Sequence, residues 1–329
     1  MIRNFNFTAL AAVLALPLVS GAAQAAYPER PITFIVPFTA GGITDLVART
    51  AAQRLEKELG QTIVVENRPG AGGSIGVEST LRTKPDGYTI FLGTQGTQIT
   101  NQLIYESAKY DGEKDFIAVH GLTALPNVVV VNSKKPYKTL KDVVDYAKLN
   151  PKALSNSSAG TGSGTHLAAA LFQSVADVQF THVPYKGSAP AITDLIGGQV
   201  DLSFDYLVST RGAIKEGRLI PIAVTSSERS PNLPEVPSMT ELGYPKATSV
   251  SWMGMFVRTG TPKDIVDRLA AAMEHVVADA IVEKTYAEFG GMTLKKSGAE
   301  FSSFVREEAV KWGSVVKALG LGKQVEEKK

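Results

Sequence analysis

The chain has 329 residues, of which 34 are Lys or Arg and 32 are Asp or Glu, and it contains no cysteine. The near balance of charge, a formal net +2, argues against nucleic-acid or polybasic membrane binding. The lack of cysteine excludes thiol catalysis, disulfide scaffolds and cysteine-ligated metals. The length suggests two domains with a large core.

Residues 1–25 have the pattern of a secretory signal peptide. Arg3 supplies the positive charge, Leu10–Val19 the apolar segment, and Ala23-Gln24-Ala25 resembles an A-x-A cleavage site. The apolar segment is too short to span a membrane. We therefore expect residues 1–25 to be removed on export, most simply to a bacterial periplasm.

Short apolar runs then alternate with helical patterns, which predicts an α/β fold with largely parallel sheets. The periodicity and end signals predict helices over residues 43–59, 139–150 and about 165–175, and a long helix that begins at Pro262. The expected strands are Ile32–Val36, Thr62–Glu66, Tyr88–Leu92, Asn127–Asn132, Gln179–His182, Leu202–Phe204 and Ile220–Thr225.

Two segments, Gly121–Pro126 and Gly243–Val250, have the composition of crossings between lobes. If the chain crosses twice, residues 26–125 and 247–329 form one discontinuous lobe, and residues 126–246 form the other. A cleft between two α/β lobes is where a small ligand is expected to bind.

The stretch PFTAGGITD, residues 37–45, joins the first predicted strand to the first predicted helix. A helix start offers unpaired N–H groups and a partial positive charge, which suit an anion. Gly41 and Gly42 allow the backbone to come close to a small group. The stretch lacks the lysine of a Walker loop and the G-x-G-x-x-G spacing, so it is no nucleotide loop. A plain tight turn is the alternative to anion binding.

Asp45 places a carboxylate in the first turn of that helix. Its charge complements the helix dipole. We also hypothesise that it accepts hydrogen bonds from water, or from a hydroxyl or ammonium group of the ligand.

A second stretch, SSAGTGSGTH at residues 157–166, also precedes a predicted helix. Hydroxyl and N–H donors without a fixed cation suit a carboxylate better than a phosphate. Because this loop belongs to the middle of the chain, it lies in the other predicted lobe. The two helix starts would then hold one small anion between them; a flexible surface linker is the alternative.

Residues 72–76, GGSIG, match the nucleophile elbow of α/β hydrolases, with Ser74 as the nucleophile. Residues 67–71 separate the match from its strand, whereas an elbow turns directly at a strand end, so a secreted hydrolase is the weaker alternative. The four histidines lack metal-ligand spacing, and we expect no metal or cofactor. His166, Asp205 and Trp252 are candidates for the cleft. The alternatives are that His166 and Asp205 cap helices and that Trp252 belongs to the core.

Over nearly its whole length after residue 25, the chain resembles the Bug (TctC-like) extracytoplasmic solute receptors of tripartite tricarboxylate transport systems. The resemblance rests on YPERPITFIVPFTAGGITD, VVENRPGAGGSIG, KPDGYTIFLG, SAGTGSGTHLAAALF, VPYKGSAPAITDLIGGQVDLSFD, LPEVPSMTELGYP and GTPKDIVDRL. It implies a type II periplasmic-binding-protein fold, in which two lobes close over a ligand. It also implies no enzyme activity.

The resemblance further implies that two loops, residues 38–45 and 158–166, hold a carboxylate. The residues that would do so are Thr39, Gly41, Gly42, Asp45, Gly162, Ser163, Thr165 and His166. Five further candidates for the distal end of the ligand are Phe38, Gln95, Gln98, Asp205 and Trp252.

The ligand expected from this resemblance is a dicarboxylate, tricarboxylate or aromatic carboxylate. The expected partner is a tripartite tricarboxylate membrane permease, with the receptor a monomer. A co-receptor that presents its ligand to a sensor kinase would use the same site and stays open as an alternative.

Overall fold

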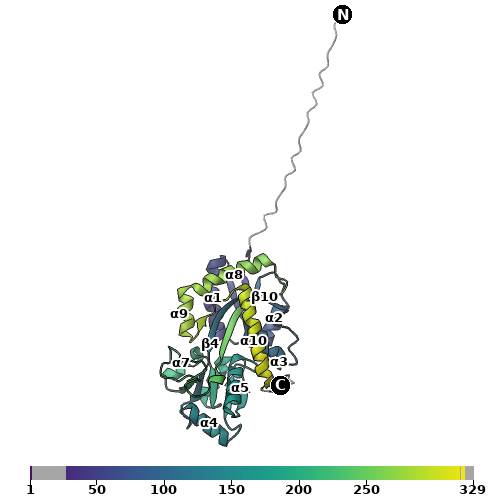
Figure 1. Ribbon diagram of the computed structural model, residues 1–329. Helices are drawn as coiled ribbons and strands as arrows, with labels where there is room; N and C mark the ends of the chain where they lie inside the picture. Colours follow the sequence, from purple (N-terminus) through teal and green to yellow (C-terminus); the bar gives the residue numbers. More distant parts are fainter. Residues whose placement is uncertain (2–26, 319, 323–329) are drawn as a thin grey trace.

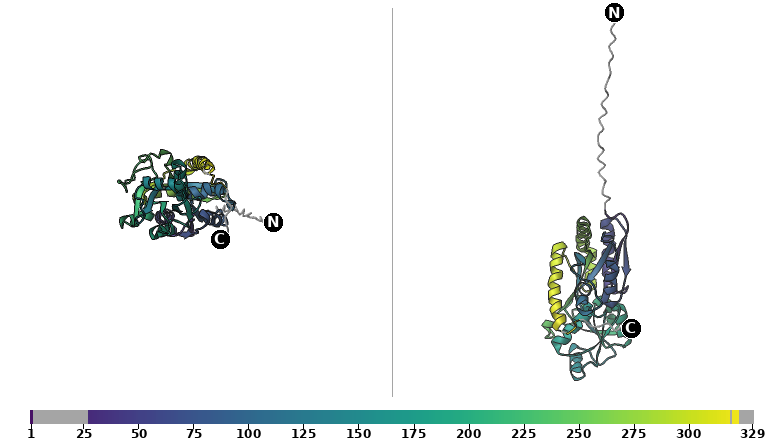
Figure 2. Two further views of the ribbon diagram at one scale, coloured as in Figure 1. Left: turned by 90° about the horizontal axis from the view of Figure 1, so that it is seen from below. Right: turned by 90° about the vertical axis from the view of Figure 1, so that its right-hand side faces the viewer.

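The computed structural model describes residues 1, 27–318 and 320–322, so residues 2–26 of the predicted signal peptide lie outside the described residues. Two mixed sheets form its framework. The teal middle of the chain forms one end of the molecule, and purple, blue and yellow-green segments form the other (Figure 1 and the right-hand view of Figure 2).

The six-stranded sheet takes strands from both ends of the chain, in the order β11-β4-β10-β3-β1-β2. Its strands are β1 (Ile32–Val36), β2 (Ile63–Asn67), β3 (Thr89–Thr94), β4 (Phe116–Pro126), β10 (Val250–Arg258) and β11 (Met292–Thr293). β1 runs parallel to β2 and β3, whereas β10 runs antiparallel to β3 and β4. A strand from late in the chain therefore joins β3 to β4.

The five-stranded sheet takes its strands from the middle of the chain, in the order β7-β6-β8-β5-β9. They are β5 (Val128–Asn132), β6 (Ser155–Ser158), β7 (Thr181–Pro184), β8 (Leu202–Asp205) and β9 (Leu219–Val224). β6 is parallel to β7 and β8, and β5 is antiparallel to β8 and β9.

Helices cover both faces of each sheet. Side chains of α1 (Ile43–Leu59), α8 (Lys263–Ala278) and α9 (Ala280–Glu288) pack with one face of the six-stranded sheet, and those of α2 (Ser74–Leu81), α3 (Asn101–Ile104) and α10 (Gly298–Ala318) with the other. On the five-stranded sheet, α4 (Leu140–Leu149) and α5 (Gly164–Ala176) pack on one face, and α6 (Ser188–Gly197) and α7 (Leu207–Lys215) on the other. Short helical turns occupy Ala71–Gly73, Gly96–Thr100 and Pro245–Ala247.

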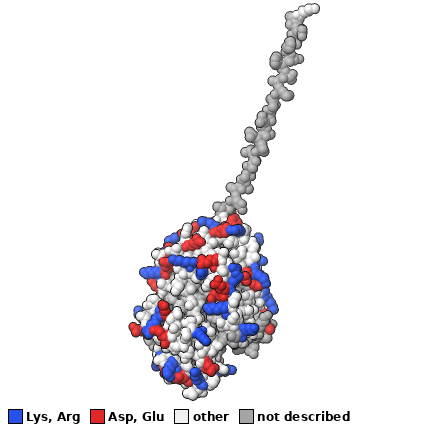
Figure 3. All heavy atoms as spheres, in the orientation of Figure 1, with Lys and Arg blue, Asp and Glu red and all other residues white. Residues whose placement is uncertain are grey.

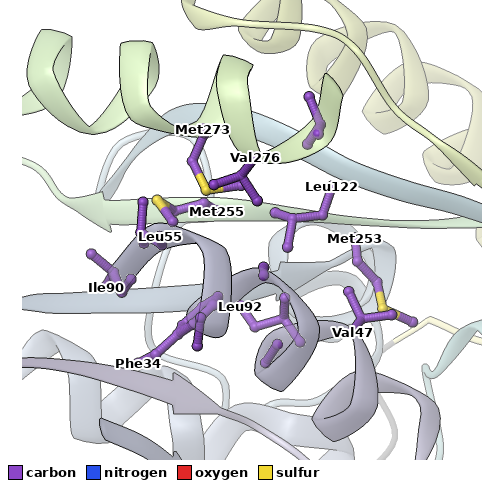
Figure 4. Packing of buried hydrophobic residues seen from close by; sticks show 14 of the residues in the cluster. Phe34, Val47, Leu55, Ile90, Leu92, Leu122, Met253, Met255, Met273 and Val276 are labelled. Atoms are coloured by element: carbon purple, nitrogen blue, oxygen red, sulfur yellow. The ribbon is translucent and has the colours of Figure 1, made fainter. Parts of the chain in front are cut away.

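The core beneath α1 fixes where that helix begins. Val47 and Leu55 of α1 meet Phe34 of β1 and Met253 of β10 in one fully buried cluster (Figure 4). Burying an apolar side chain of this size contributes about 1.5–3 kcal/mol. α1 is therefore packed against the strand that precedes it.

The chain passes from the six-stranded to the five-stranded sheet at Asn127 and returns between Val224 and Val250. The connecting segments are bonded to each other: the Asn127 N–H donates to Thr225 Oγ1 at 2.8 Å, and that hydroxyl donates to the Ser249 carbonyl at 2.8 Å. These segments lie close to the crossings expected from the sequence. The division into lobes there stays a prediction.

Several local predictions are confirmed. The seven expected strands are present with ends shifted by no more than two residues, and α1 ends at Gly60, whose φ is 68°. Thr139 caps α4 in a reciprocal capping box with Asp142. The expectation of largely parallel sheets is wrong, because β10 and β5 each pair in antiparallel fashion with two neighbours.

Within the described residues, no helix is long and apolar enough to cross a membrane. On the face drawn in Figure 3, acidic and basic side chains are interspersed. This agrees with the near balance of acidic and basic residues in the sequence.

Candidate ligand-binding site

A small pocket, with a cavity volume of about 30 Å³, lies where α1, α5 and α6 begin. Its walls come from both sheets: Gly42 and Gln95 flank the six-stranded sheet, whereas Ser163 and Ser188 flank the five-stranded one.

The start of α1 presents backbone donors to this pocket. The N-cap is Gly42, with φ −80° and ψ 170°, and no side chain caps the helix. Ile43 and Thr44, the first two helical residues, line the pocket with it. N–H groups in a first turn have no partner inside the helix, so these can serve a bound anion.

Asp45 holds the loop from behind. Its Oδ2 accepts a hydrogen bond from the Gly41 N–H at 2.9 Å, and both carboxylate oxygens accept from Arg49 Nε at 3.0 Å. Burial acts to raise the pKa of Asp45, but the hydrogen bonds from Arg49 and Gly41 outweigh it and hold that pKa below its usual value. The carboxylate thus stays ionised and fixes Gly41, next to the pocket-lining Gly42.

The start of α5 is built in a similar way. Ser163 is the N-cap and accepts from the His166 N–H, while its hydroxyl donates to the Gly160 carbonyl at 2.6 Å. The Ala159 N–H donates to Thr165 Oγ1 at 2.8 Å. These hydroxyls therefore shape the loop itself, and the start of α5, at Gly164 and Thr165, faces the pocket.

His166 packs behind this loop against a second histidine. Its ring stacks on His182 with centroids 4.0 Å apart, and its Nδ1 accepts from the Gly162 N–H at 3.1 Å. His182 Nε2 lies 2.6 Å from Ser158 Oγ. Burial lowers the pKa of His166 to about 3 and that of His182 to about 4, so both rings are neutral at pH 7.

We expect the free energy of unfolding to fall as the pH drops from about 6.5, the usual pKa of histidine, to about 4. Both histidine pKa values are lower in the folded protein than in the unfolded chain, so the unfolded chain binds protons over a pH range in which the folded protein does not. The contribution of the two neutral histidines to the free energy of unfolding is therefore fully present above pH 6.5 and is lost as the pH falls. Each proton changes the slope by about 1.4 kcal/mol per pH unit. Urea unfolding at pH 4.5–7.5 measures this.

His182→Gln is the matched variant for that experiment, and its stability should depend less steeply on pH. Asp205 acts in the opposite sense, because burial raises its pKa to about 6. Its contribution is complete below about pH 3.9, the usual aspartate pKa, and is lost as the pH rises through 6. A His182→Gln slope as steep as that of the parent would contradict the assignment.

The start of α6 adds a third helix terminus. Ser188 follows the N-cap Gly187, no side chain caps the helix, and Ser188 lines the pocket. Asp205 lies behind it, fully buried, and its Oδ1 accepts from the Tyr206 N–H at 2.7 Å. Among the described residues no cationic side chain pairs with this carboxyl.

Gln95, at the end of β3, lines the pocket and is 2 % exposed. Neither its Oε1 nor its Nε2 has a hydrogen-bond partner in the described part of the chain. Thr39 Oγ1, also on the lining, has none either. Buried polar groups in native proteins are nearly always paired, so these atoms indicate a missing partner.

The structure brings together seven of the thirteen residues that the sequence nominated. The pocket is lined by Phe38, Thr39, Gly42, Gln95, Ser163, Thr165 and Trp252. The other six, Gly41, Asp45, Gln98, Gly162, His166 and Asp205, do not line it. Gln98 faces a separate groove with Phe116 and Val305.

Sequence reasoning missed several lining residues. Ser188 could have been predicted, because the Gly187-Ser188 pair precedes an apolar helical run, as the glycines and hydroxyl residues do in the two predicted loops, residues 37–45 and 157–166. The remaining ones are Ile43, Thr44, Thr94, Ala159, Gly164, Tyr206, Ser251 and Met253. Those on β10 depend on a strand that was not predicted.

Two ambiguous candidates have clear surroundings. The Trp252 ring packs edge-on against Phe301 and Phe304, in the core beneath α10, although the residue reaches the pocket wall. Ser74 is 4 % exposed and accepts a hydrogen bond from Asn101 Nδ2 at 3.2 Å. No histidine among the described residues hydrogen-bonds to it, so the hydrolase arrangement is absent there. The described residues also hold no group of three or more His, Asp or Glu side chains suited to a metal.

Beside the pocket, two hydrogen bonds directly join the segment that follows β3 to the loop that precedes α5. Thr100 Oγ1 donates to the Gly162 carbonyl at 2.7 Å, and Tyr105 OH donates to the Thr161 carbonyl at 2.6 Å. A Cβ on Gly72 would lie 2.5 Å from that same Thr161 oxygen, so glycine is needed for this approach. The glycine-rich segment that resembled a nucleophile elbow therefore contributes to the contact between the two parts.

Residues 47–321 match the model of the tripartite tricarboxylate transporter family receptors, TctC. The periplasmic binding protein BugD is 35 % identical, with a TM-score of 0.86 over 91 % of this chain and 100 % of that one. An R. palustris protein solved with adipate is 34 % identical, with a TM-score of 0.87 over 91 % of this chain and 100 % of that one. MatC from Rhodopseudomonas palustris, with bound malate, is 32 % identical, with a TM-score of 0.84 over 88 % and 100 %.

Proposed function

Because this chain belongs to the TctC family of tripartite tricarboxylate transporter receptors, we propose that it captures a small organic carboxylate and delivers it to a membrane permease. It is a solute-binding receptor of the periplasmic Bug type and not an enzyme, like its family and solved relatives. The fold and family expected from the sequence motifs are thereby confirmed.

The proposal of a carboxylate ligand rests on the helix starts around the pocket. Three helix starts, those of α1, α5 and α6, contribute residues to one pocket whose described lining holds no Lys, Arg or His. Helix N-termini attract anions through their N–H groups and dipoles. The ligands named for two relatives, adipate and malate, are both carboxylates, which supports the proposal.

Capture would proceed by closure of two lobes, residues 26–125 with 247–329 and residues 126–246. The carboxylate binds at one helix start and the other lobe closes over it, since a ligand shifts the equilibrium only when it binds the closed form more tightly. The contacts of Thr100 with Gly162 and of Tyr105 with Thr161 would form on closure. The finer assignment of Thr39, Gly42, Ser163 and Thr165 to the carboxylate belongs to this proposal.

Export to the periplasm is supported by the predicted signal peptide and by the periplasmic relative BugD. A permease partner is supported by the family name alone. Delivery would then release the ligand when the lobes open at the permease.

A thermal-shift screen of protein recovered from a periplasmic fraction tests the proposal. The panel contains mono-, di- and tricarboxylates, aromatic acids and, as neutral controls, the corresponding amides and alcohols. A ligand at 100 times its Kd stabilises by about 2.7 kcal/mol, which corresponds to roughly 5–10 °C in a chain of this size. Shifts confined to carboxylates would support the function.

A panel in which no carboxylate shifts the Tm, with protein shown to be ligand-free by mass spectrometry, would contradict it. Failure to recover the protein in the periplasmic fraction would contradict the export.

A further inference from the structure

The side chains that line the pocket are neutral. Hydroxyl groups, one amide, the indole N–H of Trp252 and apolar groups make up the lining, and within the described residues it contains no Lys, Arg, His, Asp or Glu. The anion site is therefore made of helix starts, and a second charged group on the ligand would find no side chain of opposite charge.

The buried charges near the pocket disfavour a second anionic group. Asp45 is matched by Arg49, but Asp205, behind Ser188, has no cationic partner among the described residues. Moving a carboxylate from water into such surroundings is costly unless it is paired. One carboxylate can be served by the helix starts, and a second would add to the unmatched negative charge.

Gln95 indicates what the rest of the ligand must supply. Its amide oxygen needs a donor and its amide N–H₂ needs an acceptor, and both atoms are buried and unpartnered at 2 % exposure of the residue. An ionised carboxylate offers only acceptors, so it would leave Gln95 Oε1 unpaired or opposed to another oxygen. A primary carboxamide has a donor and an acceptor side by side and can satisfy both atoms at once.

We propose, building on the carboxylate-receptor function, that the ligand of this protein is a monocarboxylate with an uncharged carboxamide at its other end, which pairs with Gln95. The carboxylate lies at the helix starts of α1, α5 and α6. Gln95 is then a specificity residue that separates half-amides from the diacids of the same length.

Isothermal titration with matched pairs of probes tests this directly. The pairs are succinate and succinamate, glutarate and glutaramate, adipate and adipamate, and terephthalate and 4-carbamoylbenzoate; the members of each pair differ only in one carboxylate or carboxamide. In the pair that fits the pocket, the half-amide should bind at least about tenfold more tightly, since an unpaired buried polar group typically costs about 1–3 kcal/mol.

Gln95→Leu should remove this preference by weakening the half-amide to the level of its diacid. Gln102→Leu is the control from the same segment, because the Gln102 amide pairs with the Gln98 carbonyl and the Gly112 N–H outside the pocket. Gln102→Leu should keep the preference. Loss of the preference in both variants would show that Gln95 does not act specifically and would overturn its assignment.

The outcomes also separate this inference from the proposed function. Diacids that bind as tightly as, or more tightly than, their half-amides would overturn the inference and leave the carboxylate receptor intact. Binding by none of the half-amides would also overturn it, and the thermal-shift panel of carboxylates then decides independently whether the function itself fails.

Discussion

Replacing Gly42 with valine is expected to weaken carboxylate binding by at least about tenfold while the protein stays folded. Gly42 is the N-cap of α1 and lines the pocket. Its φ of −80° and ψ of 170° are open to any residue, and a Cβ there would meet only the Thr39 carbonyl, at 3.4 Å. The larger side chain would therefore enter the ligand space, where overpacking typically costs about 1–3 kcal/mol.

Titration calorimetry with the tightest carboxylate of the screening panel, together with thermal unfolding, measures both effects. Gly42→Ala is the matched control, since alanine and valine are similarly poor N-caps but alanine occupies less of the pocket. Binding should weaken progressively from glycine to alanine to valine. Normal binding by Gly42→Val would contradict the placement of the carboxylate beside the start of α1.

Gly164→Ala is expected to cause a comparable loss of binding by keeping the two parts of the molecule apart. Gly164 is the first residue of α5, and a Cβ there would overlap the Ser251 hydroxyl on β10 and come within 2.9 Å of Tyr206 OH. Alanine suits a helix better than glycine, so the local backbone is not strained. The expected weakening is about tenfold to a hundredfold, from an overpacking cost of about 1–3 kcal/mol.

A double-mutant cycle with Ser251→Gly isolates this contact. If the overlap with Ser251 is the main cause, Gly164→Ala should weaken binding less in the Ser251→Gly background, because only the longer contact with Tyr206 OH then remains. An equal loss in both backgrounds would contradict Ser251 as the group responsible. Binding constants for the parent, the two single variants and the double variant complete the cycle.

The parts of the site that could be predicted are those determined by a short continuous stretch of sequence. The run of apolar strand, paired glycines and amphipathic helix at residues 32–59 predicts a strand–turn–helix, and Gly42 and Thr39 of that turn line the pocket. Local pattern does not say which way a side chain turns. Asp45 lies in the first turn of α1, next to the pocket-lining residues, but its carboxylate points away from the pocket and bonds to Gly41 and Arg49.

The parts that could not be predicted depend on pairing between distant segments. Ser251 and Met253 reach the pocket because β10 inserts between β3 and β4, and nothing near residue 250 encodes that position. The mixed strand directions were missed for the same reason. Gln95 was nominated, but the unpaired state of its amide, on which the ligand class rests, is a property of the packed structure.

The insertion of β10 also constrains the order of folding. During folding, β3 and β4 cannot be joined in one sheet until β10, residues 250–258, pairs with both of them. The strands of the five-stranded sheet, in contrast, all lie between residues 128 and 224. Contacts over long sequence separations form slowly, because the intervening loop must be closed first. The middle of the chain should therefore gain hydrogen-exchange protection before β10 does, and a chain whose last segments are still missing leaves the inner edges of β3 and β4 open to chaperones.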